Sequence, residues 1–450
     1  MIEELQRLGA AGRRVRIPPE MDVPLTSRVG RLLDTAEMRR LSRISQLGLV
    51  QMVYPGAMHS RLEHSLGVYR NSLLVLSVLH RLEGGSAPVG TRAAEAFVMA
   101  ALLHDIGHWP FCHAIEDMRL TGLIRHEARV SRWLRGGELE RLIRQDWQCN
   151  VDDLMSLLLG KRVGDSELSD REIELLASCL SGPIDVDKLD YLVRDSLHAG
   201  VPYGRHFDAA RLVAAMTVDP RRPRLAISEK GRTAAEMMVF ARYVMFSEVY
   251  WHHAVRAATA MLQRSVFLLR DRVDFESMMA LDEAAWVEAW RQAAAASDCA
   301  GTQRLVQGLF GPVRSLYKRG CEFNVSHAAD IHSMLAHRPY WWLVACAAEL
   351  AKLLSRHTGL SIEPNDILID APPVKLEVDI NVAVVMRDGA VRPLAEVSPV
   401  AEVLAHQQFD GHVKRVRIFV RPDLRESLQP LLIDERWIRK AVQTSLNEIA

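Results

Sequence analysis

Residues 101–116 read ALLHDIGHWPFCHAIE and hold the densest group of histidines in the chain. An apolar run leads into His104, and His108 follows four residues later. If the helix continues through this stretch, the two imidazoles lie on one face, because side chains four apart on a helix are neighbours. Seven of the 17 histidines fall between positions 59 and 126, a window of 68 residues. Since neutral imidazole is the commonest metal ligand in proteins, this enrichment predicts a chemical site.

Two further segments supply ligands of matching type. The run HSRLEH (59–64) ends in His64, and the run DVDKLDYLVRD (185–195) carries Asp187 at a helical step. Asp105 adjoins His104, and two short side chains at neighbouring positions can converge on one cation at a helix end. Imidazoles and carboxylates drawn from separate helices make a nitrogen and oxygen site suited to Fe²⁺, Mn²⁺ or Zn²⁺.

The composition excludes several classes of protein. The 450 residues are 49% hydrophobic and 25% charged, which is ordinary globular composition. Because 56 basic residues balance 56 acidic ones, the total charge does not indicate a nucleic-acid partner, although a neutral total can hide a local basic patch. The longest apolar runs, 96–103 and 340–348, are far shorter than the roughly 18 residues of a membrane span. With no secretory signal and no CxxC pair among six cysteines, we expect a soluble, reduced, cytoplasmic protein without a membrane partner.

The pattern along the chain predicts a mainly α-helical fold. Helical periodicity starts at Thr26, has a first stop at Gly48, and dominates to about residue 270. Glycine and proline break it at 55–57, 84–90 and 181–183.

The character of the chain changes twice after residue 270. Residues 271–300 are acidic, alanine-rich and expected to be helical. Beyond Pro364, residues 374–385 and 413–420 alternate like strands, with a turn signal at Asp388–Gly389. We therefore expect three units, namely a helical core at 1–270, a helical satellite at 271–364, and a small α+β segment at 365–450 that ends in a helix.

Four segments together carry a resemblance to a known family. They are LLDTAEMRRLSRISQLG (32–48), VYPGAMHSRLEHSLGVY (53–69), ALLHDIGHWPFCHAIE (101–116) and IDVDKLDYLVRDSLHAGV (184–201). In this order they resemble the metal-dependent phosphohydrolases of the HD-domain superfamily, and within it the dGTPase-like deoxynucleoside triphosphate triphosphohydrolases. The resemblance covers about residues 14–265 and is loose beyond them.

This resemblance implies a fold, an activity and a cofactor. The fold is a helical HD-domain core, and the activity is hydrolysis of a (deoxy)nucleoside triphosphate to nucleoside and inorganic triphosphate. The implied ligands of a divalent metal are His64, His104, Asp105 and Asp187. Fe, Mn or Zn is expected at this His/Asp site, and Mg²⁺ is expected with the triphosphate. A bound divalent ion lowers the pKa of its water and withdraws charge from a phosphoryl oxygen.

The resemblance also implies roles for the residues around the metal. The catalytic set is His108, His113, Glu116 and His126, and the family usually has aspartate where Glu116 stands. Either His113 or His126 can donate a proton to the departing 5′ oxygen, and the sequence leaves both open. The implied substrate-binding residues are Gln46, Leu47, Arg61, Lys188, Tyr191, Asp195, Arg242 and Tyr250. His59 and His80 lie outside the matched positions and are expected to be ordinary surface or capping histidines.

Among these substrate-binding residues, the resemblance implies that Arg61, Lys188 and Arg242 hold the triphosphate and that Tyr191 contacts phosphate or sugar. It also implies that Gln46, Leu47 and Asp195 line the deoxyribose and that Tyr250 lies on the base side.

Two alternatives to nucleoside triphosphate hydrolysis stay open, and an oligomeric state is also expected. A metal centre alone does not select one phosphoester, so another nucleotide or a nucleic-acid end is the alternative within the enzyme class. A non-catalytic nucleotide sensor is the second alternative, although a sensor has no need of three additional histidines. Members of the family assemble, and apolar runs such as YWWLVACAAELAKLL (340–354) favour a homo-oligomer of at least two chains.

Overall fold

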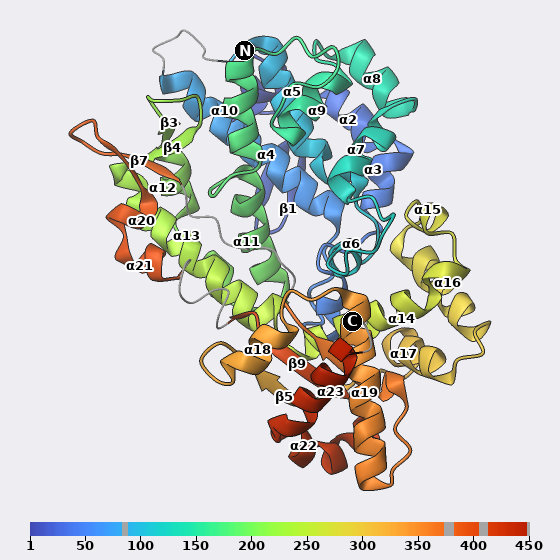
Figure 1. Cartoon of the computed structure of the whole chain (residues 1–450). Coiled ribbons are helices and arrows are strands. Elements are labelled where there is room, and N and C mark those ends of the chain that lie inside the picture. The colour runs from blue at the N-terminus through green and yellow to red at the C-terminus, as the bar shows by residue number, and fades with distance from the viewer. Residues whose placement is uncertain (83–88, 373–381, 405–412, 448–450) are drawn as a thin grey trace.

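The computed structural model describes residues 1–82, 89–372, 382–404 and 413–447. Within these residues the chain is mainly α-helical with three small sheets, so the expected fold class is confirmed (Figure 1). No helix in the described ranges is long and apolar enough to cross a lipid bilayer.

The chain up to Leu269 forms a layered bundle of helices. Its α-helices are α1 (Glu3–Arg7), α2 (Ser27–Leu33), α3 (Ala36–Leu41), α4 (Arg61–Leu82), α5 (Thr91–Leu103), α6 (Cys112–Glu116), α7 (His126–Leu134), α8 (Glu138–Asp146), α9 (Val151–Leu159), α10 (Asp170–Leu180), α11 (Val186–His198), α12 (Ala209–Ala214), α13 (Arg232–Met245) and α14 (His253–Leu269). Short 3₁₀ turns are η1 (Gly48–Met52), η2 (His104–Gly107), η3 (Tyr203–Arg205) and η4 (Glu229–Gly231), and a π-helical turn is η5 (Phe246–Tyr250). Helix α5 lies in the middle of the bundle, because residues 96–103 are all buried and both α4 and α9 pack against it.

Local caps fix where several of these helices begin. Asn150 and Asp153 form a reciprocal capping box at the start of α9, and Ser169 and Glu172 form another at α10. Asp185 accepts a hydrogen bond from the Lys188 backbone N–H and so starts α11. Helix α11 therefore carries the predicted ligand Asp187 in its first turn.

The first predicted helix is wrong in its length. The continuous helix expected from Thr26 to Gly48 is divided into α2 and α3, and residues 42–47 are irregular. The break arises at Thr35, whose side chain accepts from the Met38 N–H and starts a new helix. Helix α3 ends at Leu41, so Gln46 and Leu47 lie on a loop rather than on a helix.

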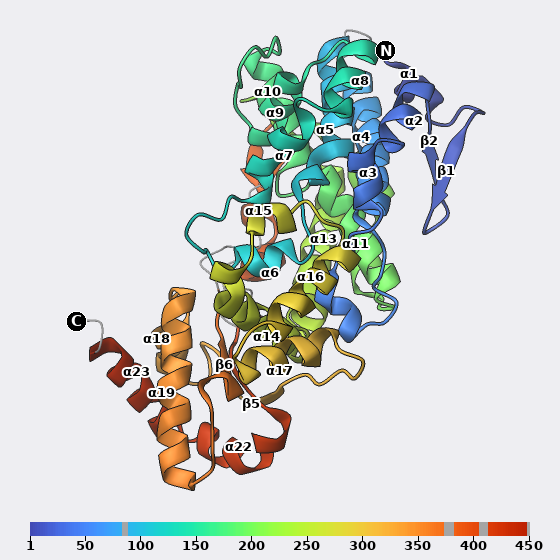
Figure 2. The same cartoon turned by 90° about the vertical axis from the view of Figure 1, so that its right-hand side faces the viewer.

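The second half of the chain adds further helices and 3₁₀ turns. They are α15 (Phe275–Met278), α16 (Glu283–Ala295), α17 (Ala300–Phe310), α18 (Ala329–Leu335), α19 (Tyr340–Thr358), α20 (Leu394–Val397), α21 (Pro399–Val403), α22 (Arg425–Ile433) and α23 (Glu435–Asn447), with 3₁₀ turns η6 (Arg270–Arg272), η7 (Pro364–Asp366) and η9 (Pro422–Leu424). Residues 271–300 are helical as expected, and Trp286 and Trp290 of α16 are fully buried against Leu49 and Phe111 of the first half. Figure 2 shows α18, α19, α22 and α23 below the bundle, with α14 between the two groups.

The described residues form three small sheets, and two of them connect distant parts of the chain. Strands β1 (Arg14–Ile17) and β2 (Met21–Pro24) form an antiparallel hairpin. The second sheet has the order β3-β4-β7-β8, and the third has the order β5-β9-β6. Their strands are β3 (Met216–Val218), β4 (Leu225–Ser228), β5 (Lys318–Phe323), β6 (Ile367–Asp370), β7 (Ala383–Val385), β8 (Val391–Pro393) and β9 (Val416–Val420).

The two strands predicted after Pro364 lie in different sheets. Of the first, residues 383–385 form β7, which pairs in parallel with β4, and residues 374–381 lie outside the described residues. Of the second, residues 416–420 form β9, which pairs with β5 and β6. The predicted turn at Asp388–Gly389 connects β7 and β8 as a hairpin, with Gly389 at a φ of +83°.

Candidate active site and metal centre

A cavity of about 560 Å³ lies where α4, α6, α7, α11 and α14 meet η1, η2 and η5. Thirteen of the sixteen predicted site residues line it: Gln46, Leu47, Arg61, His64, His104, Asp105, His108, His113, His126, Asp187, Tyr191, Asp195 and Tyr250. Glu116, Lys188 and Arg242 are not part of its lining. The sequence motifs therefore converge on one space, although Gln46 and Tyr250 are 204 residues apart in the chain.

The HDIGH motif adopts a geometry that the sequence did not predict. Helix α5 ends at Leu103, and His104 begins the tighter turn η2. His104 and His108 therefore do not share a helix face. The His104 ring lies 5.2 Å from the His64 ring, whereas the His108 ring lies 3.8 Å from that of His126. The motif thus contributes one imidazole to each of two neighbouring groups.

The four predicted metal ligands are adjacent and mostly buried. His64 Nε2 lies 3.0 Å from Asp187 Oδ1, and His104 Nε2 lies 3.2 Å from Asp105 Oδ1 and 3.9 Å from Asp187 Oδ1. Burial opposes ionisation of Asp187, but the hydrogen bond and charge of His64 outweigh it and lower the pKa of this carboxyl to about 2. The pKa of Asp105 is likewise held well below its usual value against burial, by the positive charges around it. Both carboxylates are ready to bind a cation.

The orientation of the two imidazoles fits a metal ion. His104 Nδ1 faces the Ala101 carbonyl at 2.9 Å, and this leaves Nε2 buried without a hydrogen-bond partner beside two carboxylates. His64 Nδ1 contacts Asp190 Oδ2 at 2.8 Å and likewise directs Nε2 toward Asp187. Metal-bound histidines usually donate the second ring N–H to a carboxylate or a carbonyl. The residues present therefore fit a divalent metal.

Asp190 is a functional residue that the sequence motifs did not single out. Besides His64, its two oxygens accept hydrogen bonds from Arg194 Nε at 2.8 Å and from Arg194 Nη2 at 2.7 Å. The side chains of Asp190 and Arg194 are each about 1% exposed. A Cβ at position 67 would lie 1.8 Å from Asp190 Oδ1, so only Gly67 lets α4 approach α11 this closely. The glycine three residues after His64 was the available signal.

A second glycine contact places His126, one of the predicted catalytic histidines. A Cβ on Gly107 would lie 2.3 Å from the His126 carbonyl oxygen and 3.0 Å from the Val130 nitrogen. Glycine at this position therefore lets the start of α7 pack directly on η2. His126 is the first residue of α7 and is brought into the cavity by this contact.

Glu116 binds His126 rather than His113. Its Oε2 lies 2.9 Å from His126 Nδ1 and 3.9 Å from His113 Nδ1, and its Oε1 accepts the His126 backbone N–H at 2.6 Å. Burial opposes ionisation of Glu116, but these hydrogen bonds lower the pKa of its carboxyl. His108 is buried between these groups, and burial together with the Arg61 charge lowers its pKa well below the usual value. The side chain of His113 is 61% exposed to the cavity.

The three predicted phosphate-binding cations differ in their contacts. Arg61 starts α4 and donates from Nη1 to Asp105 Oδ2 at 2.8 Å. Lys188 donates from Nζ to Asp185 Oδ2 at 2.6 Å. Arg242 is buried on α13, where its charge and that of Lys188 partly offset the burial that raises the pKa of Tyr191. Of the three, Arg61 lines the cavity, whereas Lys188 and Arg242 do not.

At the other end of the cavity Asp195 is held by two side chains. The Tyr250 hydroxyl donates to Asp195 Oδ2 at 2.6 Å, and His59 Nε2 lies 2.9 Å from Asp195 Oδ1. His59 is only 4% exposed, so its expected role as a surface or capping histidine is wrong. Gln46 lines the same cavity with its amide oxygen buried and without a hydrogen-bond partner.

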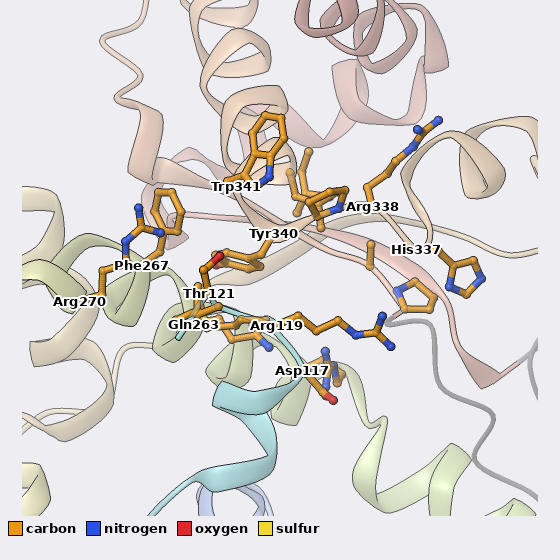
Figure 3. A pocket seen from close by; sticks show the side chains of 18 residues that line it. Asp117, Arg119, Thr121, Gln263, Phe267, Arg270, His337, Arg338, Tyr340 and Trp341 are labelled. Carbon is orange, nitrogen blue, oxygen red and sulfur yellow. The ribbon is translucent and has the colours of Figure 1, made fainter. Parts of the chain in front are cut away.

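A second cavity of about 350 Å³ adjoins the first and contains none of the predicted residues (Figure 3). Asp117 and Arg256 line both cavities. The further side chains around it include the basic and aromatic residues Arg119, Phe267, Arg270, His337, Arg338, Tyr340 and Trp341. The sequence motifs did not predict this cavity. Its lining comes largely from α14, α19 and the loop after α6, and these segments lie outside the motifs.

Comparisons with known proteins relate the chain to HD-domain proteins. The family model of the HD associated region matches residues 207–440. An uncharacterized protein of Methanocaldococcus jannaschii is 29% identical over 85% of this chain and 74% of its own length. The deoxynucleoside triphosphate triphosphohydrolase SAMHD1 of Xenopus laevis is 30% identical over 41% of this chain and 33% of its own length.

A solved structure extends the likeness over nearly the whole chain. A hypothetical protein from Aquifex aeolicus superposes with a TM-score of 0.71 and 25% identity, over 93% of this chain and 99% of that protein. The family model covers just over half of the chain, and the histidine and aspartate residues of the HD motif lie together in the cavity. The chain therefore belongs to the HD phosphohydrolase family, in the group that carries the HD associated region.

Proposed function

We propose that this chain hydrolyses (deoxy)nucleoside triphosphates at the α-phosphorus. A water oxygen adds to phosphorus, the bond between phosphorus and the nucleoside 5′ oxygen breaks, and nucleoside and inorganic triphosphate leave. The observation that carries the proposal is the single cavity that holds the metal-ligand group, His113 and His126, and the Asp195–Tyr250 pair. The Xenopus laevis relative is named a deoxynucleoside triphosphate triphosphohydrolase, and this name supports the same reaction.

His64, His104, Asp105 and Asp187 would hold the metal. A divalent ion there supplies charge for the phosphoryl oxygens and a more acidic water. Asp190 keeps His64 in the tautomer that offers Nε2, and Arg61 balances the second oxygen of Asp105. These contacts arrange the ligand atoms before any ion binds.

The leaving 5′ oxygen needs a proton, and His126 is the better of the two candidate donors. Its Nδ1 contacts Glu116 at 2.9 Å, so its orientation is fixed and a positive charge on the ring is stabilised. His113 lies 3.9 Å from the same carboxylate and is mostly exposed. Glu116 thus acts as the positioning residue and His126 as the acid.

Substrate contacts are proposed at both ends of the cavity. Arg61, Lys188 and Arg242 place three positive charges around the phosphates, and Tyr191 lies next to the last two. At the far end, Asp195 offers an acceptor and the Gln46 amide offers a donor, and Tyr250 lies on the base side. A 3′-hydroxyl can donate to Asp195 while it accepts from the Gln46 amide, which fits a nucleoside rather than a free phosphate.

Product analysis tests the proposal directly. The chain is incubated with each dNTP and Mn²⁺ or Mg²⁺, and products are separated by anion-exchange chromatography. Nucleoside with inorganic triphosphate is the expected pair, and the double variant His104→Ala/Asp105→Ala should lose Mn²⁺ binding and turnover with its helical circular dichroism retained. His80→Ala, which removes a histidine outside the cavity, is the matched control. Tight nucleotide binding without turnover would instead support a sensor.

The adjoining cavity favours a second candidate function, hydrolysis of a phosphodiester that carries nucleosides on both sides. Arg119, Arg270 and Arg338 bring positive charge to it, and Tyr340 and Trp341 offer aromatic faces. Arginine together with aromatic stacking is a common way to hold an unpaired base and its phosphate. Under this candidate a dinucleotide or a nucleic-acid end is cleaved to a nucleoside monophosphate, and dNTPs yield no inorganic triphosphate.

A further inference from the structure

Three imidazoles and a thiol form a second group of potential metal ligands in the wall of the cavity. His108, Cys112, His113 and His126 each offer one ligand atom, and these atoms all lie within 4.8 Å of one another. They come from the end of η2, from α6 and from the first residue of α7. None of the four belongs to the His64/His104/Asp105/Asp187 group.

The hydrogen bonds around this group resemble those around metal-bound histidines. His126 Nδ1 contacts Glu116 Oε2 at 2.9 Å, and His108 Nδ1 contacts Asp105 Oδ1 at 3.1 Å. With each Nδ1 directed to a carboxylate, the Nε2 atom carries the lone pair. This carboxylate–histidine arrangement fixes the tautomer and raises the basicity of a ligating imidazole.

The separation between two of the nitrogens fits a tetrahedral ion. His108 Nε2 and His113 Nε2 are 3.3 Å apart. Two nitrogens bound to zinc at about 2.0–2.1 Å with a tetrahedral angle are separated by about 3.3–3.4 Å. Cys112 is 1% exposed, so its sulfur is the fourth donor on the protein side, while His113 faces the open cavity. An ion can therefore enter from the cavity, where it reaches His113 first and the buried sulfur of Cys112 last.

We propose that His108, Cys112, His113 and His126 form a second transition-metal site, distinct from the His/Asp centre. Imidazole and thiolate ligands suit Zn²⁺ or Co²⁺, and they disfavour Mg²⁺ and Mn²⁺, which prefer oxygen. The thiol must lose its proton to bind, so loading of the site releases a proton. Asp105 connects the two sites, because Oδ1 contacts both His104 Nε2 at 3.2 Å and His108 Nδ1 at 3.1 Å.

Occupancy of this second site regulates the reaction. An ion on His113 and His126 takes the nitrogen lone pairs that a proton donor needs, so Zn²⁺ at this site inhibits hydrolysis. This consequence rests on the proposed function, whereas the binding of the ion does not.

Cobalt spectroscopy tests the binding. Co²⁺ is titrated into the full chain and into His104→Ala, which removes a ligand of the His/Asp centre and none of the second group. We expect His104→Ala to retain one Co²⁺ per chain with a thiolate-to-cobalt charge-transfer band. Cys112→Ser should lose the band and bind Zn²⁺ at least tenfold more weakly. Cys149→Ser, at a buried cysteine outside the group, should keep both.

The outcomes separate the site from the activity. Absence of the thiolate band from the unaltered chain and from His104→Ala, or its persistence in Cys112→Ser, would overturn the second site. In assays supported by Mn²⁺, the inhibitory Zn²⁺ concentration should rise at least tenfold in Cys112→Ser, with basal turnover unchanged. If no substrate is hydrolysed but the cobalt band is present, the proposed function fails while the metal site stands. If Zn²⁺ inhibits the unaltered chain and Cys112→Ser equally, inhibition through this site is refuted.

Discussion

Replacement of Asp190 by asparagine should weaken both the fold and the metal centre. Asp190 Oδ2 is shared by His64 Nδ1 and Arg194 Nε, and Oδ1 accepts from Arg194 Nη2. In Asp190→Asn one of these oxygens becomes an NH₂ group. If the amide oxygen stays at the shared position, the NH₂ group faces the Nη2 donor, and in the opposite orientation it faces His64. Either way, one buried donor loses its acceptor.

The size of the effect follows from burial and from the contacts that remain. Removal of one partner of a buried ion pair typically costs about 3–5 kcal/mol. Arg194 still donates to Glu63 Oε1 at 2.7 Å, so we expect about 3 kcal/mol, the lower end of that range. With an unfolding entropy of about 2.1 cal/mol/K per residue, a chain of 450 residues loses about 3 °C in Tm for this change. Loss of the contact that orients a metal-bound histidine should also weaken metal binding by about 10–100-fold.

Two measurements on the same protein check this prediction. Thermal unfolding is followed in the presence of chelator, and the metal Kd is measured by titration at pH 7. Asp170→Asn is the control, because that carboxylate is 87% exposed in its pair with Arg162 and exposed pairs contribute about 0–1 kcal/mol. Equal Tm and equal Kd for Asp190→Asn and the unaltered chain would refute the assigned role of Asp190.

The sign of the pH dependence gives a further check. Burial raises and the contacts with Arg194 and His64 lower the pKa of Asp190, and the lowering dominates. A carboxyl with a lowered folded-state pKa stabilises the protein above its ordinary value of 3.8 and loses that contribution as the pH falls through the folded-state pKa. The difference in Tm between the two proteins should therefore be constant above about pH 5 and shrink in acid.

Three further predictions address the catalytic side of the cavity. His126→Ala should reduce turnover by about 10²–10⁴-fold with nucleotide binding retained, and His113→Ala should have the smaller effect; equal losses in steady-state assays would contradict the choice of donor. Gly107→Ala should force α7 away from η2, lower the free energy of unfolding by about 1–3 kcal/mol and lower kcat. A normal Tm and a normal rate would show that this contact accommodates a methyl group. Tyr250→Phe should raise KM for dNTPs about tenfold, as expected for loss of a hydrogen bond to a charged group, and should affect 3′-deoxy analogues less. An identical change in KM for both substrate classes would place the tyrosine away from the sugar.

Much of the candidate site was predictable because its residues belong to short local motifs. The helical step and the cap at Asp185 determine where Asp187 stands on α11, and the apolar run before His104 determines the end of α5. Chain connectivity within each motif therefore places each ligand. The division of the chain into three units remains a prediction.

The parts that sequence reasoning missed depend on contacts between distant segments. Asp190 is defined by His64, which is 126 residues away, and His59 is defined by Asp195, which is 136 residues away. Neither partner can be identified from the hydrophobic periodicity, because this pattern does not distinguish a polar residue that is buried from one that faces solvent. The pairing of β7 with β4 likewise joins segments that are more than 150 residues apart.

Glu116 illustrates how a departure from the expected residue fits this particular geometry. The family position usually holds aspartate, whose arm is one methylene shorter. Here the carboxylate spans from α6 to α7 and makes two contacts with His126, one to the backbone N–H through Oε1 and one to Nδ1 through Oε2. The backbone contact satisfies an N–H at the start of α7, which has no partner within the helix. The side-chain contact fixes the imidazole, while Gly107 fixes the approach of the same residue from the other side. Position and orientation of His126 are therefore set by separate contacts, and the longer arm is what allows one carboxylate to serve both the helix and the ring.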